Sequence, residues 1–119
     1  MNKFIDCPAE RAVYFLGGKW KIRILFSLLQ RKKIRFGELK KGLKTITQQM
    51  LSKQLKELEV DGIVNRKVYR VVPPKVEYSL TEFGFSVMPI LRSFSEWSKK
   101  NTRTISVKLN KNFEENRIT

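Results

Sequence analysis

The chain has 119 residues, which fits one domain with a single hydrophobic core. Its 25 lysines and arginines against 11 acidic residues give a formal net charge of +14, which favours a polyanionic partner, nucleic acid before membrane. Histidine is absent and there is one cysteine, so the commonest metal ligand and any internal disulfide are excluded. We therefore expect no metal or cofactor site and a cytoplasmic location. No apolar run approaches the roughly 18 residues of a membrane span, and residues 1–6 lack the apolar stretch of a secretion signal.

Two helices are predicted at the start of the chain. Asp6 or Cys7 takes the cap position of the first helix, Pro8 fits its first turn, and Gly17-Gly18 breaks it. The second helix covers about residues 19–30 and is apolar on most sides, so we expect it at the centre of the core.

A pair of helices joined by a short turn is predicted next. Ile34-Arg35 is expected as a short edge strand, followed by a small helix over residues 36–43. Only a few residues separate this helix from a longer one over residues 45–62, which Thr45 or Thr47 can cap. Helices joined by so short a turn must cross steeply, as in a helix-turn-helix.

The longer helix has two different faces. Ile46, Met50 or Leu51, Leu55 and Leu58 recur at helical spacing and are expected to face the core. The outer face carries amides and hydroxyls at its start and lysines further along, namely Thr47, Gln48, Gln49, Ser52, Lys53 and Lys56. Amides and hydroxyls can read base edges, while lysines neutralise phosphates. Taken alone, this stretch also fits an ordinary solvated amphipathic helix.

A basic hairpin is predicted after this helix. Residues 63–71 and 76–80 are rich in β-branched and aromatic side chains, and the turn between them contains Pro73-Pro74. The basic side chains of this ribbon are Arg66, Lys67, Arg70 and Lys75. For Arg66 two roles stay open: a phosphate contact, or a structural pair with an acid such as Glu77. Glu38 and Glu77 are expected to pair with cations of the same chain.

The last predicted helix starts at Thr81 with Glu82 and ends near Asn101. It carries two apolar stripes, more than a small domain needs for its own core, so we expect a second chain to cover it. Pro89 is expected to kink this helix or loosen its second turn. Residues 103–109 alternate weakly between polar and apolar side chains, and residues 110–119 are expected to be frayed or disordered. One domain over residues 7–105 is thus predicted, with a flexible tail over residues 106–119.

The order of these elements predicts a mainly α fold with a small β-hairpin, the winged helix-turn-helix, dimerising through its terminal helices. In such domains the third core helix enters the major groove of DNA and the hairpin lies on the backbone or in the minor groove.

Motifs along the chain then reveal a resemblance to a known family. They are Gly17-Gly18-Lys19-Trp20, Arg35-Phe36-x-Glu38-Leu39, Met50-Leu51-x-x-Gln54-Leu55-x-x-Leu58-x-x-Asp61-Gly62, Arg66-x-x-Tyr69, Pro73-Pro74-x-Val76-Glu77-Tyr78-Ser79-Leu80-Thr81-x-x-Gly84 and Trp97. From about Cys7 to Trp97 the chain closely resembles the HxlR family of bacterial transcription regulators, relatives of the MarR-type winged helices. The resemblance implies a homodimer that binds palindromic operator DNA near promoters, as repressor or activator.

The resemblance also implies where DNA is contacted. The family's recognition-helix start falls on Thr47, Gln48, Gln49, Ser52 and Lys53, and its wing on residues 66–75. With Lys56 of the helix and with Arg66, Arg70 and Lys75 of the wing, these make up the predicted DNA-contacting set. Lys19 and Arg35 stay open between a contact and a structural role, since Lys19 stands beside Trp20.

Cys7 is a candidate sensor of oxidants or electrophiles. A thiol at a helix N-terminus, near Arg11, favours the thiolate form, and several HxlR-type regulators use an N-terminal cysteine in this way. The alternative is a small packing residue that caps the helix. Because the chain has no second cysteine, oxidation could join Cys7 only to another subunit or a small thiol, or stop at the sulfenic acid.

The sequence therefore predicts a homodimeric, sequence-specific DNA-binding regulator with no cofactor, no membrane partner and an unidentified effector. The alternative is a non-specific or RNA-directed nucleic-acid-binding protein. An enzyme is not expected, because a thiol enzyme built on Cys7 would have no histidine to act as base.

Overall fold

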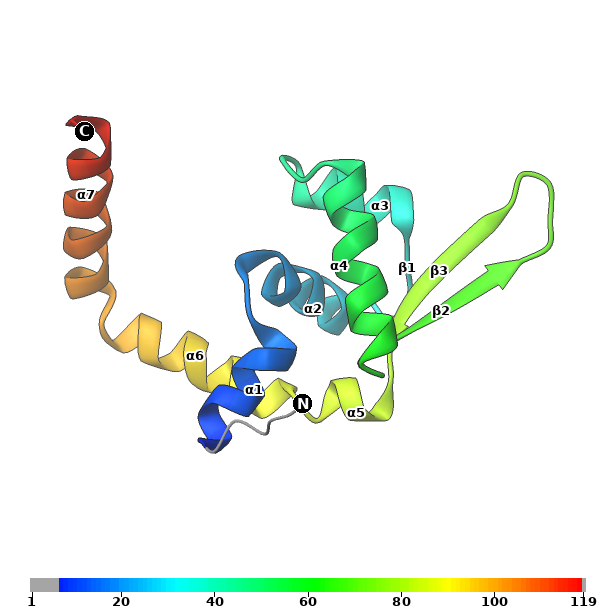
Figure 1. Ribbon diagram of the computed structural model, residues 1–119, viewed down its shortest axis with the longest axis horizontal. Helices are drawn as coiled ribbons and strands as arrows, with labels where there is room; N and C mark the ends of the chain where they lie inside the picture. The colour runs from blue at the N-terminus through cyan, green and yellow to red at the C-terminus, as the bar shows by residue number, and fades with distance from the viewer. Residues whose placement is uncertain (1–6, 119) are drawn as a thin grey trace. The chain divides into compact units, whose positions relative to one another are not determined.

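The computed structural model describes residues 7–118, and the side chains of residues 7–111 (Figure 1). The chain divides after Ser86 into two compact units, Met1–Ser86 and Val87–Thr119. In residues 7–118 there is no helix long and apolar enough to cross a bilayer.

Helices form most of the first unit, within the bounds predicted for them. They are α1 Pro8–Leu16, α2 Lys19–Gln30, α3 Phe36–Leu43 and α4 Gln48–Val60. Gly18, whose φ of 95° suits a residue without Cβ, separates α1 from α2. The apolar stripes of α2 and α4 supply six of the ten largest fully buried side chains among residues 7–111, namely Ile24, Leu25, Leu28, Leu51, Leu55 and Leu58. The central position predicted for the second helix is confirmed.

The turn between α3 and α4 is short, as predicted for a helix-turn-helix. Lys44 adopts φ 62° and ψ −78° there, the strained conformation of a classic γ-turn, and the Thr45 N–H donates to the Leu43 carbonyl at 2.8 Å. Thr47 is the residue that caps α4, because its Oγ1 accepts a hydrogen bond from the Met50 N–H at 3.0 Å.

Three short antiparallel strands form the sheet. They are β1 Ile34–Arg35, β2 Val64–Tyr69 and β3 Lys75–Leu80, in the order β1-β3-β2. Ile34 lies opposite Tyr78, and Arg66 faces Tyr78 from the other side. The predicted edge strand and hairpin are confirmed, and the hairpin extends beyond the helices as a wing (Figure 1). The architecture is that of a winged helix.

The single long helix predicted after Thr81 is wrong. Two helices stand in its place, α5 Glu82–Phe85 and α6 Met88–Lys100. The physical reason is Pro89, which lies in the first turn of α6, where its missing N–H costs no hydrogen bond. In an unbroken helix its ring would clash with the carbonyl of Phe85, four residues earlier.

The chain after α6 is also helical, as α7 Thr102–Ile118. The weak alternation noted in residues 103–109 therefore belongs to a helix. Ile105 and Leu109 are four residues apart, which fits a helix equally well, and the Ile105 N–H donates to the Asn101 carbonyl at 2.9 Å. The flexibility of residues 106–119 stays a prediction.

Candidate nucleic-acid interface

The first two turns of α4 present an open polar surface. Thr47, Gln48, Gln49 and Ser52 are exposed and line a hollow of about 680 Å³. The Thr47 hydroxyl accepts the cap hydrogen bond and still has its own hydrogen to donate outward. The structure thus brings the predicted amide and hydroxyl residues together on one exposed face.

A second hollow lies between α4 and the wing. Its volume is about 510 Å³, and its walls include Ser52, Lys56, Glu59, Arg66 and Tyr78. Two cations and two hydroxyls lining one concave surface suit an anionic oxygen, whereas Glu59 opposes it. Three residues of the predicted DNA-contacting set, Ser52, Lys56 and Arg66, therefore line one hollow, whereas Arg70 and Lys75 are not among its lining residues.

Arg66 has no ion-pair partner within the described part of the chain. The strand register places Lys67, rather than Arg66, opposite Glu77. The structural pair considered for Arg66 with Glu77 is therefore not found, and the guanidinium faces the hollow beside α4.

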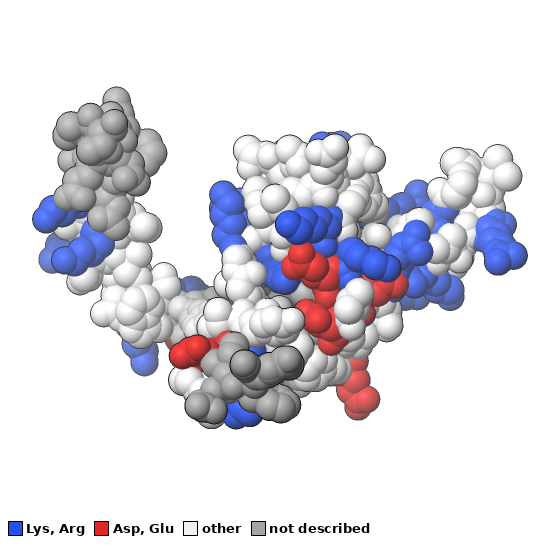
Figure 2. Space-filling view, in the orientation of Figure 1, with Lys and Arg blue, Asp and Glu red and all other residues white. Residues whose placement is uncertain are grey.

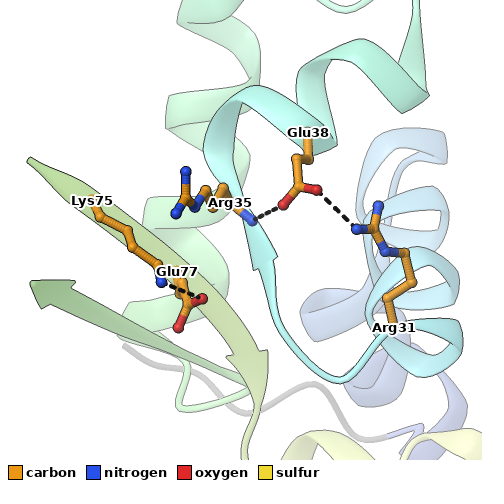
Figure 3. Close-up of polar contacts among 5 residues, drawn as sticks. All are labelled: Arg31, Arg35, Glu38, Lys75 and Glu77. Atoms are coloured by element: carbon orange, nitrogen blue, oxygen red, sulfur yellow. Dashed lines mark hydrogen bonds and ion pairs between the residues drawn. The ribbon is translucent and has the colours of Figure 1, made fainter. Parts of the chain in front are cut away.

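The acid of the wing is paired with a lysine of the predicted DNA-contacting set. Lys75 Nζ lies 3.4 Å from Glu77 Oε2 (Figure 3). The same Nζ lies 4.6 Å from the centre of the Tyr69 ring. A hydrogen bond from the Tyr69 hydroxyl, and then the charge of Lys75, lower the pKa of the Glu77 carboxyl. Lys67 Nζ lies 4.8 Å from the same ring, so both lysines of the wing make a cation–π contact with Tyr69.

Glu38 is also paired inside the chain, as predicted. Its carboxylate accepts from the Arg31 guanidinium at 2.8 Å and from the Arg35 N–H at 3.1 Å, and these contacts lower the pKa of its carboxyl. The Arg35 side chain points away from Glu38 (Figure 3). Lys19 lies 4.8 Å over the Trp20 ring, which favours its structural role.

Charge is unevenly distributed over the visible surface. Lysine and arginine side chains gather along the wing, at the right of the view in Figure 2. Arg70 is exposed near the tip, beside Val71 and Val72, which are exposed as well.

Cys7 occupies the N-cap position of α1, but its side chain makes no cap hydrogen bond. Its thiol is exposed, which does not fit the alternative of a packing residue. Asp6, the other cap residue considered, lies outside the described residues.

One polar residue of this region escaped the sequence prediction. Lys21, in the first turn of α2, is buried, and its Nζ lies 2.7 Å from Glu57 Oε1 on α4. A signal was present, since Lys21 precedes Ile24, Leu25 and Leu28 at the spacing of the buried stripe.

The part of the chain that the structure describes contains no group of three or more His, Cys, Asp or Glu side chains that could hold a metal ion. The arrangement offers hydrogen-bond donors, acceptors and cations on an exposed surface, which suits binding of a charged polymer.

Comparisons with known proteins agree with the fold. The HxlR-like helix-turn-helix family model matches residues 15–106. The HTH-type transcriptional regulator YdeP of Bacillus subtilis (strain 168) is 50% identical over 99 residues, covering 83% of this chain and 77% of that protein. The structure of the redox regulator HypR in its reduced form has a TM-score of 0.80 at 46% identity, covering 85% of this chain and 99% of that one. The structure of HypR in its oxidised form has a TM-score of 0.73 at 49% identity, covering 80% of this chain and 97% of that one.

Proposed function

Because this chain belongs to the HxlR-like helix-turn-helix family of DNA-binding transcription regulators, we propose that it acts as a homodimer on a palindromic operator. In each subunit α4 enters the major groove, and the wing lies on the neighbouring backbone. The observation that carries the proposal is the polar, exposed start of α4, which continues into the cation-lined hollow beside the wing.

Base reading is assigned to the first turns of α4. Gln48 and Gln49 carry amides that can pair in bidentate fashion with adenine, and Thr47 and Ser52 carry hydroxyls that suit several bases. All four side chains are exposed. A glutamine that reads a base edge gives up water on binding and recovers both hydrogen bonds only on the correct base.

Backbone contacts are assigned to the cations around this face. They are Lys53 and Lys56 of α4 and Arg66, Arg70 and Lys75 of the wing. Each neutralised phosphate releases a counterion, so these contacts supply affinity that depends on salt and does not depend on sequence.

Pairing of two subunits is assigned to apolar helix faces. Phe94 and Trp97 are exposed on α6, and Val13 and Tyr14 are exposed on α1. Two recognition helices related by a two-fold axis require half-sites about one helical turn, roughly 34 Å, apart.

Selection from randomised duplexes, followed by competition, tests the proposal. A specific regulator should enrich an inverted repeat and bind it at least about a thousandfold more tightly than bulk DNA. A general nucleic-acid binder would enrich no sequence and would bind RNA and DNA according to charge alone.

A redox response is proposed for Cys7, in view of its exposed position at the N-cap of α1 and the likeness to a redox regulator. Peroxide oxidises the thiolate to a sulfenic acid and is itself reduced to water, and a second thiol can then displace water to give a disulfide. Operator affinity should change after treatment with peroxide and return with dithiothreitol. A Cys7→Ser variant should not respond, and an unchanged response in that variant would rule out this role.

A further inference from the structure

Lys21 is the only charged side chain that is buried among residues 7–111. It is 7% exposed and lies on the same side of α2 as the core residues Ile24 and Leu28. Lysine is almost never buried in this way without a partner. Its partner is Glu57 of α4, with Nζ 2.7 Å from Oε1, and the hydrogen bond from Lys21 is the main cause of the lowered pKa of the Glu57 carboxyl.

This ion pair holds one flank of the recognition helix. Leu51, Leu55 and Leu58 point from α4 into the core, and at 100° per residue Glu57 lies about 120° around the axis from Leu51. Lys53, of the predicted DNA-contacting set, is one helical turn before Glu57. The pair therefore lies between the core stripe of α4 and its exposed face.

The flank is otherwise only loosely packed. A hollow of about 330 Å³ lies beside the pair, lined by Tyr14, Lys21, Lys56, Glu57, Val60 and Asp61. The hydrophobic effect that buries the leucines has no preferred direction, whereas a hydrogen-bonded ion pair at 2.7 Å has a defined direction. The pair is thus the contact on this side that opposes rotation of α4.

We propose that Lys21 is a positioning residue for DNA recognition, which sets the rotation of α4 about its own axis through Glu57. The inference rests on the proposed function. A rotation of α4 carries Gln49 sideways across the base edges, while the lysines of the same helix still reach phosphates because their side chains are long and flexible. Loss of the pair should therefore reduce sequence discrimination more than overall affinity.

Stability alone does not account for Lys21. Burying an ion pair often stabilises a protein no more than well-packed apolar residues of similar volume do. Methionine has a similar length and would fill the same space. Methionine could not, however, form the directional contact with Glu57 that fixes the arrangement of α4.

Two variants of opposite charge change test the proposal, Lys21→Met and Glu57→Gln. For each we would measure the affinity for the duplex that the wild-type protein selects, the affinity for a random duplex at the same salt concentration, and the urea unfolding midpoint. The ratio of the two affinities should fall about tenfold or more in both variants, the loss expected when one bidentate base contact is misplaced. Glu57 is 42% exposed on its side chain, so glutamine is compatible with folding there.

The exposed pair Arg31–Glu38 supplies the matched control, since neither residue lies on α4. Arg31→Met and Glu38→Gln carry the same charge changes, and their affinity ratios should stay within about twofold of wild type. The inference is overturned if Lys21→Met and Glu57→Gln keep the wild-type ratio, or if the ratio rises in one and falls in the other with the sign of the charge. A wild-type protein that selects no sequence would instead overturn the proposed function.

Discussion

Lys75 Nζ lies 3.4 Å from Glu77 Oε2, two residues further along the same strand. Side chains two apart on a strand point to the same face, so an acid of the wing partly neutralises a lysine assigned to the DNA backbone. The wing therefore binds a polyanion less strongly than its count of cations suggests.

Removal of this acid should strengthen DNA binding without changing its sequence preference. In Glu77→Gln the lysine is released and one repulsive charge is lost, so the slope of log affinity against log salt should steepen by up to about 0.9. Fluorescence anisotropy over a salt series measures the slope. The control is Glu82→Gln, which removes the same charge from an exposed residue of α5, outside the wing. An equal change of the slope in this variant would show that net charge alone is responsible.

Substitutions of Gln49 and Arg70 should affect DNA binding differently, because Gln49 is assigned to base readout and Arg70 to backbone contact. Gln49→Ala should change which bases are preferred, because an exposed amide at the start of α4 is lost. Arg70→Ala should weaken binding to every duplex alike and make the salt dependence shallower by about 0.9. Selection from randomised sites with each variant provides the comparison; an equal loss on all sequences for Gln49→Ala would reject its assignment as a base reader.

Stability should be nearly constant between about pH 5.5 and 8 and decline in acid. The pKa values of Glu38, Glu57 and Glu77 are lowered in the folded state, so their contribution is present above the ordinary glutamate value, about 4.3, and is lost as the pH falls through the lowered values. Urea midpoints measured from pH 8 to pH 3 test this, and Glu38→Gln should flatten the acid decline. With no histidine in the chain, a drop between pH 6 and 7 would contradict the explanation.

In the turn between α3 and α4, glycine at position 44 should give a more stable protein than the native lysine. Lys44 has φ 62° and ψ −78°, a sparsely populated conformation that costs a residue with Cβ at least roughly 1 kcal/mol. Glycine removes that cost but gives the unfolded chain more freedom, so Lys44→Gly should raise the free energy of unfolding by up to about 1 kcal/mol. Lys41→Gly, with the same charge change inside α3, should lower it by about 1 kcal/mol. Urea denaturation distinguishes the two, and a loss of stability in both would refute the strain argument.

Most of the first unit could be predicted because its signals are local. Gly17-Gly18 separates two helices, Thr47 caps a third, and Pro73-Pro74 marks the turn of a hairpin; each of these acts on its immediate neighbours. Pro89 alone does not predict a complete break, because the same proline is compatible with a kink inside a helix or with the first turn of a new one.

The candidate site was less predictable, because its pairs join residues far apart in sequence. Lys21 and Glu57 are separated by 36 positions, and only the packing of α2 against α4 brings them together. Glu77 could be expected to meet some cation, but which of Arg66, Lys67 and Lys75 it meets depends on strand register and side-chain direction. Neither of these is encoded by composition or spacing.

The division of the chain after Ser86 has a consequence for how such regulators could combine. The residues assigned to DNA reading all precede this point, whereas the exposed aromatic face of α6, one of the two faces assigned to subunit pairing, follows it. Two different chains with compatible α6 faces could therefore pair, and each would contribute its own α4. Such a mixed dimer would recognise two unlike half-sites, so a cell with several related regulators could address more promoters than it has regulators.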